Sequence, residues 1–430
     1  MLRLALFQSE SVTRIQTASL FVLDGLANLT DFAFHFWLGR VLIPSEFAIL
    51  QTLNSVVLVY VTASGVFQPV VGRFVAEARA RGADHESSIP AIFQSFLRAA
   101  AWLGLLLAFT VFALAGWLAE LLNLPVWSIQ ISAALIFLST LRPVAVGVLQ
   151  GQERFISFGL SRLLTALGRL MIALLLVYGG SGMMGAVVAF PLGWLIGVAA
   201  AFLLLGRSVW KKQEKVPGLV RRGGELSFYA LIAYIAFMLL TSLDLVWVNR
   251  SLSGDIAGAY ASLVLLRRVI ALLPGIAVTV MFPRIAAVLA QHRSPNRLLA
   301  NTAAIILTAS GALTIMYFLF GEPLILNIFG EAYRPAFPLL GWMGIAMIGV
   351  SLSSVWLNYY LAEQPRNYVI LLVATAVFEW VLLTQLPPSM ESAVLAFGAA
   401  GWLLTIGGLL LYLFKVGRLP RQDAGRTASQ

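Results

Sequence analysis

Long apolar stretches alternate with short polar or helix-breaking segments along almost the whole chain. An α-helix needs about 20 mostly apolar residues to cross a bilayer, so each long stretch predicts one membrane-spanning helix. Twelve such helices are predicted, at residues 15–41, 47–72, 91–119, 127–150, 155–178, 183–206, 227–251, 256–282, 299–320, 337–361, 368–386 and 392–414. Several breaks contain Pro or Gly, at Pro44, Pro125, Gly179, Gly254 and Pro387. The pattern therefore predicts an all-α polytopic membrane protein.

Composition agrees with this class and narrows the chemistry. Of the 430 residues, 60% are hydrophobic and only 11% are charged, against about a quarter charged in a soluble domain. Cysteine is absent, and the three histidines lie in separate regions. This argues against disulfides, thiolate metal sites and a histidine metal centre, so we expect no metal and no cofactor.

The basic residues lie mostly in every second connection between the predicted helices. The basic set comprises Arg73, Arg79, Arg81, Arg154, Arg207, Lys211, Lys212, Lys215, Arg221, Arg222, Arg284, Arg293, Arg297, Arg366 and, in the tail, Lys415, Arg418, Arg421 and Arg426. The alternate connections hold Arg40, Arg250 and Arg334. By the positive-inside rule, the basic set and both termini face the cytoplasm. The formal charge of +10 then reflects membrane orientation, and no nucleic-acid partner is expected.

A basic segment, "GRSVWKKQEKVPGLVRRGGEL" at 206–226, separates spans six and seven. It predicts an N-terminal six-helix lobe at 1–206, a basic cytoplasmic linker at 207–226, a C-terminal six-helix lobe at 227–415 and a cytoplasmic tail at 416–430. A weak repeat supports the division. "WLGRVLIPSEFAIL" from Trp37 aligns without gaps with "WVNRSLSGDIAGAY" from Trp247, sharing Trp, Arg and Leu. Because each copy ends the first helix of its half, the halves are expected to form a parallel repeat.

The first predicted helix carries a polar stripe. In "FVLDGLANLTDFAFHF", Asp24, Asn28, Asp31 and His35 fall within about 60° of arc at 100° per residue. Asp24 is expected near the bilayer centre, Asp31 about 10 Å further out, and His35 solvated at the outer interface. An ionised side chain facing lipid at such depth costs at least about 2–3 kcal/mol, so the stripe should face the protein interior. It serves ion coupling, pairing with cations, or only interhelical hydrogen bonding.

Arginines at membrane depth are the expected counterparts of these acids. Arg162 and Arg169 lie seven residues apart on one helix face, and Arg142 lies on the preceding span. Arg267 and Arg268 are adjacent, so they cannot share a helix face and only one is expected to line the interior.

Two further acids, Asp244 and Glu379, lie within predicted spans of the second half and are candidates for ion coupling or pairing. The deep arginines outnumber the acids available to neutralise them. Guanidinium groups bind phosphate bidentately, so the excess predicts a water-filled cavity that accepts an anionic head group.

Catalytic signatures are missing from the sequence. It contains no Gly-rich phosphate loop of the Walker type, and the predicted external loops are only a few residues long. A transporter is therefore favoured over a membrane enzyme.

Several segments resemble one family along the whole chain. "LLTSLDLVWVNRSLSGDIAGAYASLVLLRRVIALLPGIAVTVMFPRIAAV", from Leu239 to Val288, is similar to the start of the second half of bacterial polysaccharide-transporter family proteins. These are the O-antigen-type oligosaccharide flippases of the multidrug/oligosaccharidyl-lipid/polysaccharide exporter superfamily. "FWLGRVLIPSEFAILQTL", "GRFVAEARARG", "LQGQERF" and "IFGEAYRPAFPLL" extend the resemblance.

The resemblance implies two six-helix lobes in a V around a central cavity, working by alternating access in the bacterial cytoplasmic (inner) membrane. The implied cargo is a polyprenyl-pyrophosphate-linked oligosaccharide, moved from the inner to the outer leaflet for lipopolysaccharide or exopolysaccharide biosynthesis. Carried over to this sequence, the cationic cavity residues are Arg142, Arg162, Arg169 and either Arg267 or Arg268. The coupling carboxylate is Asp24 or Asp31.

Two other functions are weighed against the flippase. A cation-coupled multidrug exporter of the same superfamily should have a more acidic cavity, and a polysaccharide polymerase or ligase should have larger external loops. The expected partners are a lipid-linked anionic glycan, the lipid bilayer and other polysaccharide-assembly membrane proteins.

Overall fold

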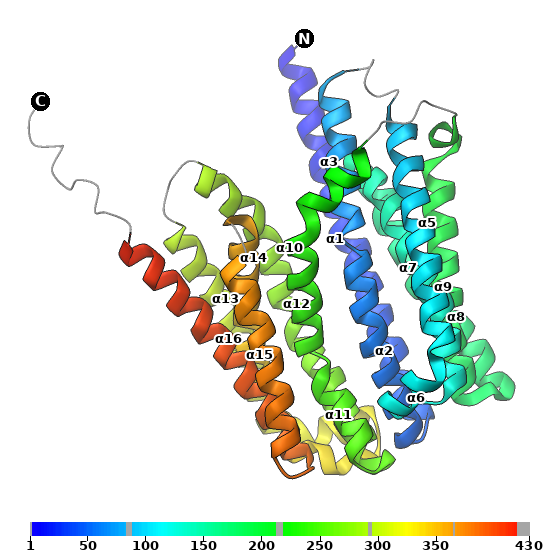
Figure 1. Cartoon of the computed structure of the whole chain (residues 1–430), viewed down its shortest axis with the longest axis vertical. Helices are drawn as coiled ribbons and strands as arrows, with labels where there is room; N and C mark the ends of the chain where they lie inside the picture. Colours follow the sequence, from blue (N-terminus) through cyan, green and yellow to red (C-terminus); the bar gives the residue numbers. More distant parts are fainter. Residues whose placement is uncertain (1, 83–87, 212–217, 291–294, 364–365, 419–430) are drawn as a thin grey trace, which may run out of the picture. The chain divides into compact units, whose positions relative to one another are not determined.

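The computed structural model describes residues 2–82, 88–211, 218–290, 295–363 and 366–418, and their regular elements are all helical (Figure 1). The helices are α1 Leu2–Val41, α2 Pro44–Ser64, α3 Phe67–Ala80, α5 Ile89–Ala113, α6 Ala115–Leu122, α7 Val126–Gly151, α8 Phe155–Leu176, α9 Gly182–Leu205, α10 Leu219–Leu240, α11 Leu243–Ser251, α12 Gly254–Ala290, α13 Asn296–Ile328, α14 Phe337–Glu363, α15 Arg366–Gln385 and α16 Met390–Arg418. Short helical turns at Val177–Ser181, Arg207–Trp210 and Glu331–Ala336 connect some of them.

The predicted fold class is confirmed. Each of the twelve predicted spans falls on one helix or on two consecutive helices. Within the described residues, nine stretches are long and apolar enough to cross a membrane, and one of them, Phe155–Leu205, covers two consecutive predicted spans. The chain is an all-α, multi-pass membrane protein.

The predicted breaks coincide with helix ends for local chemical reasons. Pro44 is the first residue of α2 and Pro125 immediately precedes α7, positions that tolerate proline because the first helical turn needs no internal N–H donor. Between α8 and α9, Gly180 has φ of 92°, a left-handed conformation that glycine adopts without a Cβ clash.

The chain divides into two compact units. Unit 1 comprises Met1–Met238, Leu245–Ser262 and Ile325–Ala336, and unit 2 comprises Leu239–Asp244, Leu263–Leu324 and Phe337–Gln430. Unit 1 thus includes two short segments from the second half of the sequence. The lobe borders at residues 206 and 227 stay a prediction.

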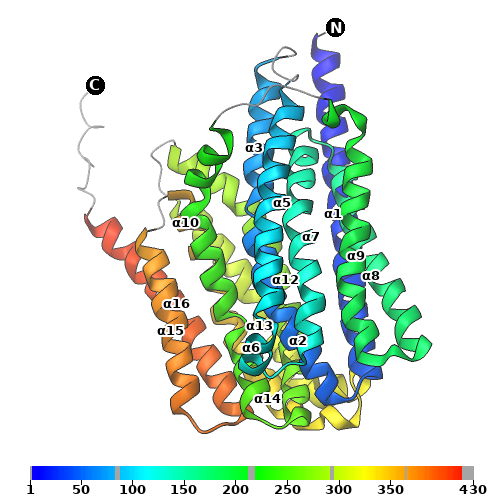
Figure 2. The same ribbon diagram turned by 45° about the vertical axis from the view of Figure 1, so that its right-hand side comes forward.

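Unit 1 is held together by close helix crossings. Its helices run side by side in both views (Figures 1 and 2), and α1 packs on α8, α8 on α9 and α5 on α7. On α7, a Cβ at Gly147 would lie 2.7 Å from the Gln68 carbonyl oxygen of α3, and one at Gly151 would lie 2.6 Å from the Gly72 oxygen. Small residues at such crossings let helix backbones approach closely inside a membrane.

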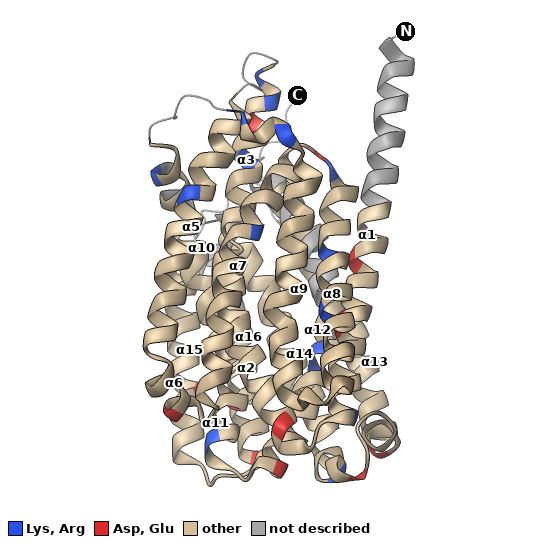
Figure 3. Ribbon diagram, turned by 90° about the vertical axis from the view of Figure 1, so that its right-hand side faces the viewer, with Lys and Arg blue, Asp and Glu red and all other residues tan. Residues whose placement is uncertain are grey.

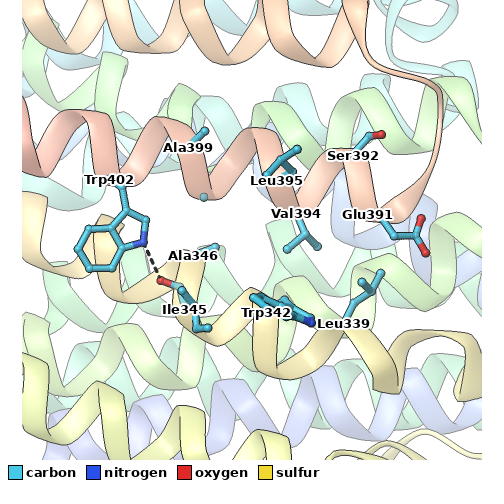
Figure 4. A pocket seen from close by; sticks show the side chains of 11 residues that line it. Leu339, Trp342, Ile345, Ala346, Glu391, Ser392, Val394, Leu395, Ala399 and Trp402 are labelled. Atoms are coloured by element: carbon cyan, nitrogen blue, oxygen red, sulfur yellow. Dashed lines mark hydrogen bonds between the residues drawn. The ribbon is translucent and has the colours of Figure 1, made fainter.

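In unit 2, α14 and α16 border an apolar groove of about 570 Å³ (Figure 4). Trp342 and Leu339 line it from α14, and Leu395 and Trp402 line it from α16. The Trp402 indole N–H donates to the Ile345 carbonyl oxygen at 3.2 Å, which joins the two helices at one end of the groove.

The internal repeat corresponds to a repeated structural role within unit 1. Arg40, at the end of α1, donates from Nη1 to the carbonyl oxygens of Leu326 and Asn327 at 3.2 and 3.3 Å, in the last turn of α13. Its repeat counterpart Arg250, at the end of α11, donates from Nη1 to the Leu121 carbonyl oxygen at 2.7 Å, in the last turn of α6. Each arginine therefore caps a helix from the other half of the sequence, where carbonyls lack partners and the helix dipole is negative.

The helix starts that follow these arginines are packed against each other. A Cβ added at Gly254 would lie 2.6 Å from the Ser45 Cβ, and one added at Gly258 would lie 2.2 Å from the Pro44 carbonyl oxygen. Pro44 and Gly254 are equivalent positions of the repeat. The first residues of α2 and α12 thus meet at a contact that only glycine permits on the α12 side.

We expect Arg40→Ala and Arg250→Ala each to destabilise the protein by about 1 kcal/mol, because each removes a charged donor from otherwise unpaired helix carbonyls. The two losses should be close to additive, since the two arginines share no hydrogen-bond partner. Thermal unfolding in detergent, followed by tryptophan fluorescence, measures both effects.

Arg73→Ala is the matched control, because Arg73 is an exposed arginine that, among the described residues, pairs with Glu77 one turn away. If both variants melt at the temperature of this control, the caps do not stabilise the fold.

Candidate functional site: buried charge clusters in the two units

The polar stripe of α1 packs against the arginines of α8. Arg162 Nη1 donates to Asp24 Oδ1, and Arg162 Nη2 donates to Asn28 Oδ1 at 2.9 Å. Arg169 Nη2 donates to Asp31 Oδ1 at 2.5 Å. Figure 3 shows acidic positions on α1 beside basic positions on α8, in helices that are otherwise almost free of charge at mid-length.

The two ion pairs form a regular ladder. Both join residues that are 138 positions apart in the sequence, so α1 and α8 run parallel and stay in register over two turns. A separation of seven residues returns to nearly the same face of an α-helix, which lets both rungs form on one contact. The ladder therefore fixes the register of the two helices.

Arg169 is the more enclosed of the two arginines, with 8% of the residue exposed. Its guanidinium carbon lies 4.4 Å from the Phe34 ring centroid and 5.0 Å from that of Phe190. Aromatic faces attract a cation most strongly where water is excluded, so the two rings stabilise the charge that Asp31 neutralises.

Sequence reasoning missed these aromatic neighbours and the glycines behind them. A Cβ at Gly193 would lie 2.6 Å from the Arg169 Cβ, and one at Gly197 would lie 1.9 Å from the Thr165 hydroxyl. The two glycines form a GxxxG pair on α9 that admits the Arg169 face of α8. The signal "GWLIG" at 193–197 was present in the sequence, whereas nothing in the sequence marked Phe34 or Phe190.

Arg142 of α7 belongs to the same cluster but differs in its partners. Its Nη2 donates weakly to the Ser161 hydroxyl at 3.4 Å, and its guanidinium carbon lies 5.5 Å from the Trp194 ring centroid. Its Nε is buried and has no hydrogen-bond partner, and among the described residues it forms no ion pair. Arg162, Asp31 and Asp24 all act on it electrostatically. The cluster thus holds three arginines and two aspartates, a formal excess of one positive charge.

The expectation that His35 is solvated at the outer interface is wrong. His35 is 6% exposed, and its Nδ1 lies 3.0 Å from Gln51 Nε2 of α2. The Phe34 and Phe190 rings lie 5.0 and 6.2 Å from its ring. The reason is that Gln51 of α2 and Phe190 of α9 pack against His35, which sequence periodicity on α1 alone does not show.

Unit 2 contains a second buried ion pair. Arg267 of α12 donates from Nη1 to Asp244 Oδ2 and from Nη2 to Asp244 Oδ1 at 3.0 Å, a bidentate arrangement. Nη2 also donates to the Thr241 carbonyl oxygen at 2.8 Å, and the guanidinium carbon lies 4.0 Å from the Phe397 ring centroid. Asp244 is 0% exposed and Arg267 is 3% exposed, so the pair is fully enclosed.

The neighbouring charges of unit 2 are placed differently. Arg268 is half-buried, while Arg267 takes the enclosed position beside Asp244. Glu379 of α15 is 0% exposed, and neither of its carboxyl oxygens has a hydrogen-bond partner among the described residues. The structure therefore brings Asp244 and Arg267 into contact, and it leaves Glu379 as a buried acid without such a contact.

The arrangement can bind charge within a membrane-embedded fold. Paired arginines keep their charge neutralised, and a surplus arginine offers donors to an incoming anion. A buried acid offers a site for a cation or a proton. Both elements suit a protein that moves a charged or amphipathic solute.

Solved structures of membrane transporters share this fold. An inward-facing multidrug resistance MATE family transporter of the MOP superfamily has a TM-score of 0.77 at 12% identity, covering 96% of this chain and 100% of that chain. The lipid II flippase MurJ in its inward closed conformation has a TM-score of 0.69 at 13% identity, covering 94% and 87%. A MOP superfamily transporter from Pyrococcus furiosus, described as having a binding pocket of reverse polarity, has a TM-score of 0.58 at 13% identity, covering 94% of each chain. No curated protein sequence matches the chain.

The fold defines a multi-pass membrane protein with the architecture of transporters and flippases of the MOP superfamily. Residues 15–289 match the polysaccharide biosynthesis protein family. The match covers more than half of the chain, and the protein belongs to that family.

We expect Asp31→Asn to destabilise the protein by about 1–3 kcal/mol, because it leaves the enclosed Arg169 without its carboxylate. Asp24→Asn should cost less, since the Arg162 side chain is 39% exposed against 10% for Arg169. The thermal unfolding midpoint of the purified protein gives the comparison.

The double variant Asp31→Leu/Arg169→Leu separates pairing from packing. Replacing both members of an enclosed pair by apolar residues is often neutral, and this pair is enclosed on its Arg169 side, so the variant should recover most of the stability lost in Asp31→Asn. Equal losses in the single and double variants would show that the pair is not what stabilises the α1–α8 contact.

Proposed function

We propose that this protein flips a polyprenyl-pyrophosphate-linked oligosaccharide, or exports a related polysaccharide precursor, from the inner to the outer leaflet by alternating access. The observation that carries the proposal is the surplus arginine of unit 1. Arg142 lies beside two complete ion pairs and has no carboxylate of its own among the described residues. A diphosphate supplies the negative charge and the acceptor oxygens that this guanidinium lacks.

The roles of the cationic residues follow from their partners. Arg142 is the primary anion-binding group, because binding a diphosphate does not require it to leave a carboxylate. Arg162 and Arg169 can contribute only by sharing or exchanging Asp24 and Asp31. In unit 2, Arg268 is the better candidate for contact with the cargo, since Arg267 is enclosed with Asp244.

Family and fold support a transported glycan. The family is described by polysaccharide biosynthesis, and one protein of the same fold is a flippase for lipid II. Both the family and its structural neighbours point to transport rather than to catalysis. We therefore infer a transporter and not an enzyme, acting on a lipid-linked anionic glycan within the bilayer and beside other polysaccharide-assembly membrane proteins.

The proposed organisation follows the charge pattern. The basic connections and both termini lie on the cytoplasmic side of the bacterial inner membrane, as the positive-inside rule indicates. Two six-helix lobes, 1–206 and 227–415, are joined by the basic linker at 207–226, and a cytoplasmic tail follows at 416–430.

A cation-coupled multidrug exporter is the second candidate, because a MATE transporter shares the fold. A cationic drug would meet a cluster that already carries one excess positive charge, formed by three arginines and two aspartates of unit 1. Like charges repel strongly in a low-dielectric site, so the cluster favours an anionic cargo.

We expect Arg142→Ala to weaken binding of a fluorescent polyprenyl-pyrophosphate oligosaccharide by about tenfold to a hundredfold, because the variant loses a charge-assisted hydrogen bond to the diphosphate. Its thermal unfolding midpoint should stay near that of the wild type, since no ion pair is broken. Binding to the purified protein and accumulation of the glycan lipid in the inner leaflet of cells provide the two readouts.

Two variants complete this test. Arg142→Lys keeps the charge but loses the planar fork, so its affinity should fall between those of the wild type and Arg142→Ala. Arg98→Ala is the control, because Arg98 is exposed and donates to the Gln94 carbonyl of its own helix. Wild-type affinity in Arg142→Ala would refute the role of Arg142, and tight binding of cationic drugs in place of the glycan lipid would favour the exporter.

A further inference from the structure

Glu379 is an acid in the interior of unit 2 without the partners that buried acids normally have. It lies on α15, is 0% exposed, and has no hydrogen bond to either carboxyl oxygen within the part of the chain that the structure describes. Asp244 is equally buried, but it accepts two hydrogen bonds from Arg267. Of these two buried acids in unit 2, Asp244 is hydrogen-bonded at both carboxyl oxygens, and Glu379 has no hydrogen bond to another described residue.

An ionised carboxylate cannot remain in such a place without compensation. Moving a charge from water into an apolar interior is so costly that an unpartnered group takes up or gives up a proton instead. Arg267 acts electrostatically on Glu379 but cannot serve it alone, because it directs both terminal nitrogens to Asp244 and one of them also to the Thr241 carbonyl. A neutral carboxylic acid is the form that fits the site.

The charged surroundings of Glu379 are few. Asp244 of α11 repels a negative charge on Glu379, and Arg267 of α12 attracts it. Arg268 lies next to Arg267 on α12, where Asp244 and Arg267 both act on it. The other titratable residues of α15 and of the helices that contact it lie near helix ends. They are Tyr359, Tyr360 and Glu363 of α14, Arg366 and Tyr368 of α15, and Glu391, Tyr412, Lys415 and Arg418 of α16.

We propose that Glu379 is the proton-binding site of the transport cycle, occupied by one proton in the conformation seen here. Release breaks the carboxyl O–H bond and transfers the proton to water that reaches the site when unit 2 rearranges. The positive charge of Arg267 then stabilises both the resulting Glu379 carboxylate and Asp244. The formal charge of the three side chains Asp244, Arg267 and Glu379 changes from zero to minus one.

Of the four candidate coupling carboxylates, the structure singles out Glu379 by its partners. Asp24, Asp31 and Asp244 are each paired with an arginine, whereas Glu379 forms no hydrogen bond or ion pair within the described residues. Glu379 can exchange a proton without breaking an ion pair.

Infrared difference spectroscopy of the purified full-length protein in lipid tests the proton directly. We expect the wild type at neutral pH to show the C=O stretch of a protonated carboxyl group in an apolar environment. The band should be lost in Glu379→Gln and kept in Glu391→Gln, a control that changes an exposed acid of α16. Because Gln has the shape and neutrality of a protonated Glu, Glu379→Gln should also unfold at the wild-type temperature. A band that survives in Glu379→Gln, or a large loss of stability in that variant, overturns the proposal.

The link to transport rests on the proposed flippase function and is measured separately. In proteoliposomes, an imposed proton gradient should stimulate flipping of a fluorescent polyprenyl-pyrophosphate oligosaccharide by the wild type, and this stimulation should be lost in Glu379→Gln while binding of the lipid persists. Unaltered stimulation in Glu379→Gln overturns the coupling role. The infrared band requires no glycan, so a band that behaves as expected in a protein that flips no glycan lipid refutes the proposed cargo and not the proton site.

Discussion

Charge neutralisation inside an apolar helix bundle is the constraint on which the rest of this structure depends. A guanidinium group stays ionised at any depth of the membrane, so each buried arginine needs a carboxylate, an aromatic face or water. Arg162, Arg169 and Arg267 each meet an aspartate from a neighbouring helix. Such pairs contribute little net stability compared with an apolar contact, but they penalise every other register of the two helices. The two ion pairs between α1 and α8 therefore specify one register of these helices, whose other contacting residues are mostly similar apolar side chains.

The same constraint explains why the two incompletely neutralised groups are the functional candidates. A surplus cation and a surplus acid are each costly to bury, and each is relieved only by something that arrives from outside the fold. For Arg142 in unit 1, that is an anion. For Glu379 in unit 2, it is a proton. A charge that is already paired gains less from an incoming ligand, because the ligand has to displace the side chain that forms the ion pair. The proposed division between structural and functional charges thus follows from the partners that the neighbouring helices provide.

Periodicity could be read from the sequence, but the identity of the facing helix could not. The lengths of the apolar stretches placed the helices, and the spacing of Asp24 and Asp31 placed both on one face. That spacing did not say which of the deep arginines would meet them, because this depends on the packing order of helices distant in the sequence. His35 shows the same limit. Its position on the stripe was correctly placed, yet its burial is decided by Gln51 and Phe190 from two other helices. The GxxxG pair behind Arg169 was readable in the sequence, because close packing in membranes requires small residues at that spacing.

The weak internal repeat acquires a physical meaning from the arginines it shares. Only three of the fourteen aligned positions are identical, and one of them is the arginine pair Arg40 and Arg250. Both lie on the side of the predicted topology where basic residues are otherwise scarce, which a rule of orientation alone does not explain. Capping explains it, since each arginine supplies a positive charge to the last carbonyls of a helix from the other sequence half. These reciprocal contacts, with the packing of Pro44 on Gly258, also account for why the segments 245–262 and 325–336 belong to unit 1 rather than to the unit that holds most of their sequence half. Both copies of this helix end carry an arginine that caps a helix of the opposite half of the sequence.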